Sequence, residues 1–230
     1  TTINSGYANS PKLTANIADH ADVHGGRSLL FDGVTDYLDC GDSTVFDITG
    51  ALSLSAWIKS SNTSNNQQII SRDNGSARCY ILLTISSSGV ARGSFWSGNA
   101  EYKAESTTNV CDGNWHYVVA TYTPSTSIKV YVDGALEATN TTSIPASLDN
   151  DDVSLNIGRK ANDSLHFNGN MADVKIFNTA LTEAQVTELY RKPENTPSAV
   201  RNNLVAWYPM IEGNPESPQS IVYDHSEKGL

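Results

Sequence analysis

Residues 28–41, SLLFDGVTDYLDCG, place three aspartates and two glycines between two short apolar runs. The first run ends at Asp32, and Gly33 follows it as a residue that turns the chain easily. Two apolar runs on either side of a polar turn predict two strands. The turn itself has two interpretations. Asp32 and Asp36 accept hydrogen bonds from backbone amides in a solvent-exposed turn, or the turn holds a calcium ion or a polar ligand.

The composition around this stretch is typical of a loop-rich β protein with one substantial core. The chain has 230 residues, of which 17% are charged, and its formal net charge is -10. This acidity argues against a surface that binds nucleic acid or anionic membranes, where cationic patches are expected. No apolar run approaches the roughly 18 residues of a membrane-spanning helix, so membrane insertion is not expected. The chain lacks an initiator Met and a leader, which suggests a mature or excised fragment.

Strand-like segments recur from residue 28 to residue 177, separated by loops rich in Asn, Ser and Gly. In residues 51–60, ALSLSAWIKS, apolar side chains alternate with polar ones, which predicts a half-buried strand. In residues 127–139, SIKVYVDGALEAT, the pair Asp133-Gly134 predicts a hairpin turn between two strands. Regular short strands with such turns indicate an all-β fold, a two-sheet antiparallel jelly-roll sandwich.

One segment has helical character, and it is followed by a change in composition. In residues 181–193, LTEAQVTELYRKP, Thr182 can cap a helix and Pro193 can end it. Residues 193–203 form a polar linker that contains proline, and strand-like character resumes in LVAWY, residues 204–208. We therefore predict a domain over residues 1–192, a linker over 193–203 and a strand-containing tail over 204–230.

The order of these segments resembles the laminin-G-like (concanavalin A-like) jelly-roll family. The resemblance covers roughly residues 26–190. It is carried by six segments in the family's order: GRSLLFDGVTDYLDCG (26–41), LSLSAWIKS (52–60), NWHYVVATY (114–122), KVYVDGALEAT (129–139), LNIGR (155–159) and FNGNMADVKIFNTALTEAQVTELY (167–190). Within this fold we expect Trp57 and Trp115 to pack between the sheets. His116 is expected to be a satisfied structural group.

The tail also resembles part of the family, the opening strand that normally precedes the FDG motif. Two interpretations follow. The tail can begin the next copy of a tandem array, which we favour, or it can fold back and complete this domain or a neighbouring one by strand addition.

The resemblance implies a calcium ion at the rim of the sandwich. The expected ligands are the carboxylates of Asp32 and Asp173, with carbonyl groups near Gly33 and Asn170. The alternative ligands are Asp36, Asp39 and the acidic loop Asp149, Asn150, Asp151 and Asp152. The sequence contains no EF-hand loop.

Carbohydrate binding and protein binding are the two functions that we consider for the polar loops, and Trp96 has a second interpretation as a residue at the rim of the core. Sugar sites pair a stacking aromatic side chain with planar polar groups. Trp96, Asn99 and Tyr102 surround a glycine turn, and Arg78 and Tyr80 lie nearby in sequence. These five residues form the predicted ligand site.

Catalysis is not expected. The closest approach to a glycosidase motif is EYKAE, in which Glu101 and Glu105 would lie about 13 Å apart along an extended strand. A retaining pair of carboxyl groups is about 5 to 5.5 Å apart, and an inverting pair is also closer than 13 Å. A glycoside hydrolase is therefore only a distant alternative.

The three cysteines are too few for a disulfide framework and have no zinc-binding spacing. Either Cys79 and Cys111 form one bridge and leave Cys40 free, or all three are reduced thiols.

The sequence thus predicts a non-enzymatic, extracellular or particle-surface module for recognition or adhesion. Its ligand is expected to be a glycan or a protein, bound through rim loops, with calcium as a stabilising ion. The alternative is a structural repeat of a virion, fibre or surface-layer assembly, whose partners are homo-oligomer or tandem-array neighbours.

Overall fold

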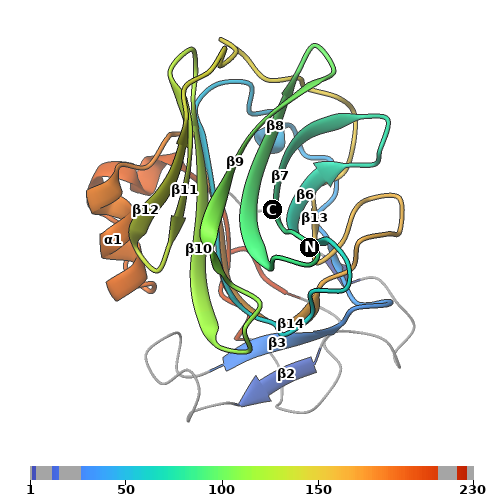
Figure 1. Ribbon diagram of the computed structural model, residues 1–230. Coiled ribbons are helices and arrows are strands. Elements are labelled where there is room, and N and C mark those ends of the chain that lie inside the picture. The colour runs from blue at the N-terminus through green and yellow to red at the C-terminus, as the bar shows by residue number, and fades with distance from the viewer. Residues whose placement is uncertain (1, 4–11, 16–26, 212–221, 227–230) are drawn as a thin grey trace.

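The computed structural model describes residues 2–3, 12–15, 27–211 and 222–226, which form a sandwich of two antiparallel sheets (Figure 1). Across sheet A the order is β1 (Thr2–Ile3), β4 (Leu38–Asp39), β13 (Asn156–Ile157), β6 (Gln67–Asp73), β7 (Arg78–Thr84), β8 (Val90–Ser97) and β9 (Ala100–Asn109). Across sheet B it is β12 (Ala135–Asn140), β11 (Ser127–Val132), β10 (Trp115–Thr123), β5 (Leu52–Lys59), β14 (Asn168–Phe177), β3 (Arg27–Asp32) and β2 (Lys12–Ala15). The predicted jelly-roll sandwich is confirmed.

The main core lies between the two sheets and follows the alternation read from the sequence. Leu52, Leu54, Ala56 and Ile58 of β5 all point into it and are fully buried. Phe95 of β8 reaches the same core from sheet A. These side chains meet because residues two apart on a strand share a face.

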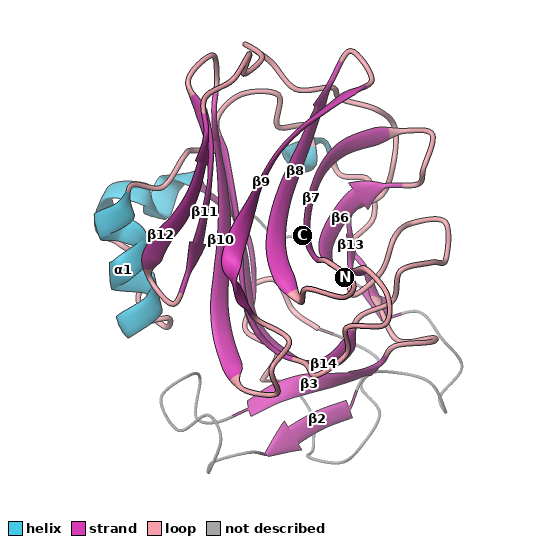
Figure 2. Cartoon of the chain, in the orientation of Figure 1, coloured by secondary structure: helices cyan, strands magenta, loops and turns pink. Residues whose placement is uncertain are grey.

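The other face of sheet B is covered by the helix α1 (Glu183–Arg191) (Figure 2). A second cluster of buried apolar residues, the helix-side cluster, fills the space between them: Trp57, Tyr117, Val119, Tyr131, Ala172, Phe177, Leu181, Val186, Leu189, Val200 and Leu204. The prediction that β5 is half-buried is therefore wrong. Trp57 and Trp115 also do not lie between the sheets, because the helix gives the outer face of sheet B its own core.

The helix begins and ends where the sequence predicts. The Thr182 side chain accepts a hydrogen bond from the Gln185 backbone N–H, and the Gln185 side chain accepts one from the Thr182 N–H. This reciprocal capping satisfies two amides that the first turn leaves without helical partners. Within the described residues, no helix has the length and the apolar character needed to cross a bilayer.

The β11–β12 hairpin also forms as predicted. Asp133 and Gly134 have φ angles of 51° and 81°, the left-handed pair that a tight hairpin turn needs. A Cβ atom at position 134 would lie 3.0 Å from the Tyr190 ring, so the helix closes down on this turn as well.

The tail strand β15 (Leu204–Tyr208) pairs antiparallel with β14 of the same domain. The first half of β14 (residues 168–171) pairs with β3, and the second half (residues 174–177) pairs with β15. On its other side β14 pairs with β5, and this ladder has a register shift between Ala172 and Lys175. Residues 204–208 therefore fold back onto this domain, as the second interpretation of the tail has it. That the tail begins a following copy in a tandem array stays a prediction. The rest of the tail, residues 212–221 and 227–230, lies outside the described residues.

Part of the predicted linker packs against the domain. Residues 198–203 form a 3₁₀ turn, and Val200 within it packs into the helix-side cluster. All three cysteines are free thiols, so the bridge between Cys79 and Cys111 is wrong. Cys79 Sγ accepts a hydrogen bond from the Asp151 backbone N–H at 3.3 Å.

Candidate ligand-binding site

The turn after β3 is organised by two carboxylates that accept backbone hydrogen bonds. Asp32 Oδ1 accepts from the N–H groups of Val34, Thr35 and Asp36 at 2.8 to 3.0 Å. Asp36 Oδ2 accepts from the Asp32 N–H at 3.0 Å. Partial burial acts to raise the pKa of Asp32, but these hydrogen bonds outweigh it and lower the pKa. The turn is thus a structural device that Asp32 and Asp36 hold closed.

The structure does not bring Asp32 and Asp173 together. Asp32 is exposed and stands opposite Asn168 in the β3–β14 ladder, five residues before Asp173. Asp173 is fully buried, where its carboxylate accepts from the Lys175 ammonium and from Trp207 Nε1. The predicted shared ligand set is wrong because the pairing register separates the two carboxylates.

The other predicted calcium ligands also serve as local hydrogen-bonding groups. Gly33 lies in the Asp32 turn with φ 76°, and Asn170 Nδ2 donates to Ser28 Oγ at 3.1 Å. Four further side chains accept hydrogen bonds. Asp39 accepts from the Gly41 N–H, and Asp149 accepts from the N–H groups of Gly98 and Asn99. Asn150 accepts from the Arg72 guanidinium, and Asp151 accepts from the Arg78 N–H. Asp152 shares a hydrogen bond with Asp42, and this contact raises the pKa of Asp152. In the part of the chain that the structure describes, no group of three or more His, Cys, Asp or Glu side chains could hold a metal.

Of the predicted sugar-binding residues, Trp96 and Arg78 do come together. They lie on the outer face of sheet A, where the Arg78 guanidinium is 5.7 Å from the Trp96 ring centroid. Trp96 is only 5% exposed because it packs with Ile81 and Leu83. We call this surface of β7, β8 and β9 the open face, since α1 covers the other sheet.

The other three predicted residues are placed differently. Tyr80 is fully buried in the main core, and its hydroxyl donates to the Phe46 carbonyl at 3.0 Å. Tyr102 is opposite Phe95 and packs against the same core. Asn99 is in the β8–β9 turn with φ 63°, and its N–H donates to Asp149. The five residues therefore do not form one site, because neighbours on a strand point to opposite faces.

The acidic residues of EYKAE lie on β9 and are paired with cations. Lys103 Nζ lies 3.6 Å from Glu101 and 3.9 Å from Glu105. Arg92 also pairs with Glu105, at 2.6 Å. The Lys103 ammonium thus lies within reach of both carboxylates of EYKAE.

His116 lies at one end of the sandwich between two carboxylates. Its Nδ1 is 2.8 Å from Asp133 Oδ2, and its Nε2 is 3.1 Å from Asp112 Oδ1. The hydrogen bond to Asp133 is the main cause of a raised pKa for His116, with burial opposing it. The prediction of a satisfied structural histidine is confirmed.

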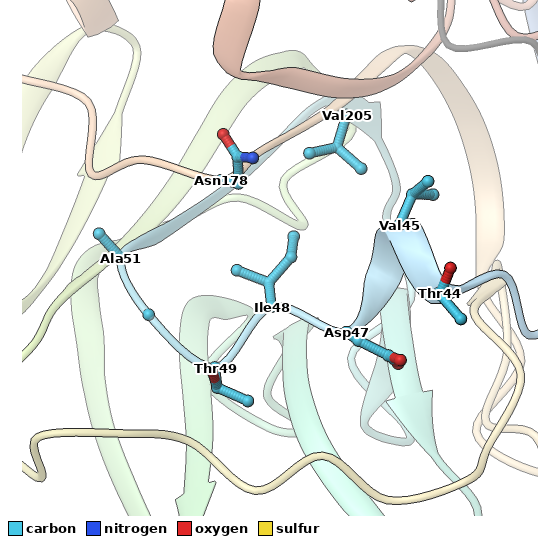
Figure 3. Close-up of a pocket in the computed structure, with 9 residues that line it drawn as sticks. Thr44, Val45, Asp47, Ile48, Thr49, Ala51, Asn178 and Val205 are labelled. Carbon is cyan, nitrogen blue, oxygen red and sulfur yellow. The ribbon is translucent and has the colours of Figure 1, made fainter.

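An open concave feature that was not predicted lies at the rim of the sandwich. It is an open cavity of about 500 Å³, the rim groove, lined by Thr44, Val45, Asp47, Ile48, Thr49, Gly50, Ala51, Asn178 and Val205. Figure 3 shows Ile48 extending from the β4–β5 loop toward Val205, with Asn178 beside them. Buried apolar side chains thus form the floor, and hydroxyl, amide and carboxylate groups lie around it.

A buried arginine holds the loop that forms this groove. Arg72 is 2% exposed and donates to the Phe46 carbonyl at 3.0 Å and to Asp47 Oδ1 at 2.7 Å. The same guanidinium binds the Asn150 side chain, so the acidic loop and the groove loop share one support. Charge-assisted hydrogen bonds of this kind fix geometry as well as supplying energy.

Sequence reasoning missed the groove because its residues come from three distant segments. Residues 44–51, TVFDITGA, carry no motif, and Asn178 and Val205 join them only through the β14–β15 pairing.

The fold and these surfaces can be compared with known proteins. A profile of the concanavalin A-like lectin/glucanase superfamily, named for laminin G, matches residues 32–187. The chain belongs to this superfamily. No curated protein sequence matches it.

Solved structures with the same fold include several carbohydrate-binding domains. A candidate carbohydrate-binding protein of Bacteroides ovatus is 19% identical with a TM-score of 0.60, and the match covers 83% of this chain and 53% of that one. The chain therefore spans about half the length of the Bacteroides protein. Domain 4 of AbnA, an extracellular GH43 arabinanase of Geobacillus stearothermophilus solved with arabinotriose, is 18% identical, with 78% and 87% covered and a TM-score of 0.58.

A third similar structure is the CBM40 of the Ruminococcus gnavus IT-sialidase, solved with α2,3-sialyllactose. It is 12% identical, the match covers 71% of this chain and 96% of that one, and the TM-score is 0.57. At such identities the likeness establishes the fold alone.

Proposed function

We propose that this domain is a non-catalytic, extracellular recognition module that binds a short glycan in the rim groove. The observation that carries the proposal is the groove itself, an open cavity of about 500 Å³ with a buried apolar floor and polar side chains around it. The binding domains among its structural relatives, including those solved with arabinotriose and sialyllactose, support a binding role of this class.

The groove chemistry suits sugars better than it suits ions or lipids. A sugar ring has an apolar face of C–H groups and a rim of hydroxyls, and Ile48 and Val205 can meet the first while Thr49 and Asn178 meet the second. An engineered cavity of roughly 150 Å³ holds one benzene ring, and a sugar ring with its hydroxyls is about twice as large, so the groove has room for one or two sugar rings. No aromatic residue is among the described residues that line it, so we expect modest affinity.

The non-enzymatic part of the proposal rests on the acidic residues. In the described residues, the carboxylates on the open face are ion-paired, and Asp32 and Asp36 are occupied by backbone amides. A glycan array followed by incubation with each bound glycan tests this point, since release of a shorter sugar would identify a hydrolase.

The groove is tested with the double variant Thr49→Ala/Asn178→Ala. Each lost hydrogen bond contributes about 1 kcal/mol, so we expect affinity for the best glycan on the array to fall at least tenfold. The matched control is Thr139→Ala, an exposed threonine on β12. Unchanged affinity in the double variant, or no binding to any glycan at high concentration, would reject the groove as a glycan site.

Calcium is a part of this proposal that needs its own experiment. A ligand that binds only the folded state raises the melting temperature. We expect the chain to melt at a lower temperature in EDTA than in millimolar calcium, and equal melting temperatures would remove calcium from the proposal.

A further inference from the structure

A second, smaller pocket lies beside β15 and is separate from the rim groove. It is a cavity of about 140 Å³, the linker pocket, lined by Glu194, Asn195, Thr196, Arg201, Leu204, Trp207, His225 and Ser226. All these residues follow residue 187, where the match to the superfamily ends. The pocket is therefore lined by a part of this chain that lies outside the family match.

The aromatic wall of the pocket is held in one orientation by a buried ion pair. Trp207 Nε1 donates to Asp173 Oδ1 at 2.7 Å, and the Lys175 ammonium is 4.8 Å from the indole centroid. Asp173 and Lys175 are both fully buried and pair with each other. His225 meets the indole edge-on, with centroids 5.8 Å apart. A ligand that stacks on this indole need not spend free energy on ordering it.

The polar side of the pocket contains a hydroxyl that has no partner among the described residues. Thr196 is 7% exposed, and its Oγ1 is buried with no hydrogen-bond partner in the part of the chain that the structure describes. Buried polar groups are rarely left unsatisfied, and each such case calls for an explanation. Beside it, Asn195, Arg201 and Glu194 contribute an amide, a guanidinium and a carboxylate, planar groups that can each bond two hydroxyls.

We propose that the linker pocket binds a single six-membered sugar ring, the terminal residue of a glycan. The volume does not exceed the roughly 150 Å³ of a cavity that holds benzene, so the pocket has room for no more than one ring. The indole receives the apolar face of the ring, and Thr196 and Arg201 receive its hydroxyls. Asp173 and Lys175 act as positioning residues, because they touch Trp207 and do not line the pocket. This inference extends glycan recognition, but it does not need the rim groove.

The full chain is titrated with a panel of methyl glucosides, galactosides, mannosides and arabinopyranosides by ligand-observed NMR. We expect saturable millimolar binding of at least one of them. Thr196→Val should weaken it about fivefold, the loss of one hydrogen bond, with the melting temperature unchanged or raised. Arg201→Ala should also weaken it, while Thr49→Ala/Asn178→Ala in the rim groove should not. Two results would overturn the proposal. One is that the groove variant, and not the linker-pocket variants, loses methyl glycoside binding. The other is that no methyl glycoside binds at about 50 mM, near the weakest measurable range.

The positioning role is tested with two double variants that remove the buried charges together, since removing one alone leaves an unpaired charge. Asp173→Asn/Lys175→Met keeps an acceptor for Trp207 Nε1, whereas Asp173→Leu/Lys175→Met does not. We expect the first to retain methyl glycoside binding and the second to lose at least fivefold, about one hydrogen bond, at matched melting temperatures. Equal binding in the two variants would show that the Asp173 acceptor does not orient the indole for the ligand.

Discussion

The outer faces of the two sheets are built from the same alternating strand pattern and have different surroundings. On sheet B, Trp57 stacks on Tyr190 of the helix and lies 5.4 Å from Tyr117 in a cluster of eleven buried residues. On sheet A, Trp96 forms a cluster with two other buried residues among those described, Ile81 and Leu83, and Arg78 lies over its ring. The two indoles are 8% and 5% exposed, so exposure alone does not distinguish them. The number of apolar partners, and not burial of the side chain, therefore makes a face into a core.

The largest expected effect is at the helix-side cluster. Trp57→Ala removes the side chain on which Tyr190 of the helix stacks and leaves a cavity in its place. Neighbouring side chains could fill this cavity only if the helix moved. We expect a loss of about 3 to 5 kcal/mol in unfolding free energy, or about 10 °C or more in melting temperature. Denaturant and thermal melts measure it, and a loss below about 1 kcal/mol would mean that the helix does not form a core with sheet B.

The matched change on the open face should be milder. Trp96→Ala leaves Ile81 and Leu83 next to solvent instead of a closed cavity, so we expect a loss of about 1 to 2 kcal/mol. Lys103→Ala on the same face should change stability by less than about 0.5 kcal/mol, because its ion pairs are exposed. Equal losses of unfolding free energy for Trp96→Ala and Trp57→Ala in the same melts would contradict this difference between the two faces.

The next largest effect on stability is expected at Glu137, whose carboxylate joins the edges of the two sheets. Glu137 of β12 accepts from the N–H and hydroxyl groups of Thr107 and Thr108 of β9 at 2.5 to 3.2 Å. Burial opposes ionisation, but these bonds outweigh it and lower the Glu137 pKa from its usual value of 4.5. Its contribution is therefore present above pH 4.5 and is lost as pH falls through the lower folded-state value.

Glu137→Gln should cost about 1 kcal/mol at pH 7 and less at pH 3, because protonation already weakens the same contacts in the parent chain. Melts at the two pH values measure the difference. The matched control is Glu188→Gln, which changes an exposed carboxylate on α1 and should leave stability nearly unchanged. A Glu137 variant that is equally destabilised at both pH values would show that its charge is not what holds the edges together.

The smallest effect on stability is expected at His116 of β10, whose imidazole contacts aspartates in two loops. The hydrogen bond to Asp133 raises the pKa of His116 above 6.5, against the effect of burial. The stabilisation is fully present below pH 6.5 and is lost as pH rises through the raised folded-state value. His116→Asn should therefore flatten the decline in melting temperature between about pH 6 and pH 8.5, a window that spans the unperturbed value. An unchanged pH profile would contradict this role.

The sequence was sufficient for the features that depend on local chemistry. Thr182 and Gln185 cap the helix, Asp133-Gly134 makes the hairpin, and Asp32 closes its own turn. Each depends on residues within a few positions of one another, so the pattern and the structure coincide. The fold followed because these local elements occur in the order of one known architecture.

The sites depend on register and long-range pairing, which the sequence does not display. Asp32 and Asp173 were predicted to share a cation, but the β3–β14 register sets Asp32 opposite Asn168, and Asp173 pairs with Lys175. Tyr80 and Trp96 were predicted to form one site, but they point to opposite faces of sheet A. A strand shifted by one residue would exchange those faces, so site residues cannot be assigned before register is known.

Alternation and capping act over a few residues, so the residue pattern alone predicts the sandwich, its helix and its turns. The return of LVAWY to β14, the second core between the helix and sheet B, and the groove that residues 44–51 form with Asn178 and Val205 all depend on contacts between distant segments. A groove or an aromatic wall forms where such segments pack, because each segment buries its apolar face against whichever partner the sheet order supplies.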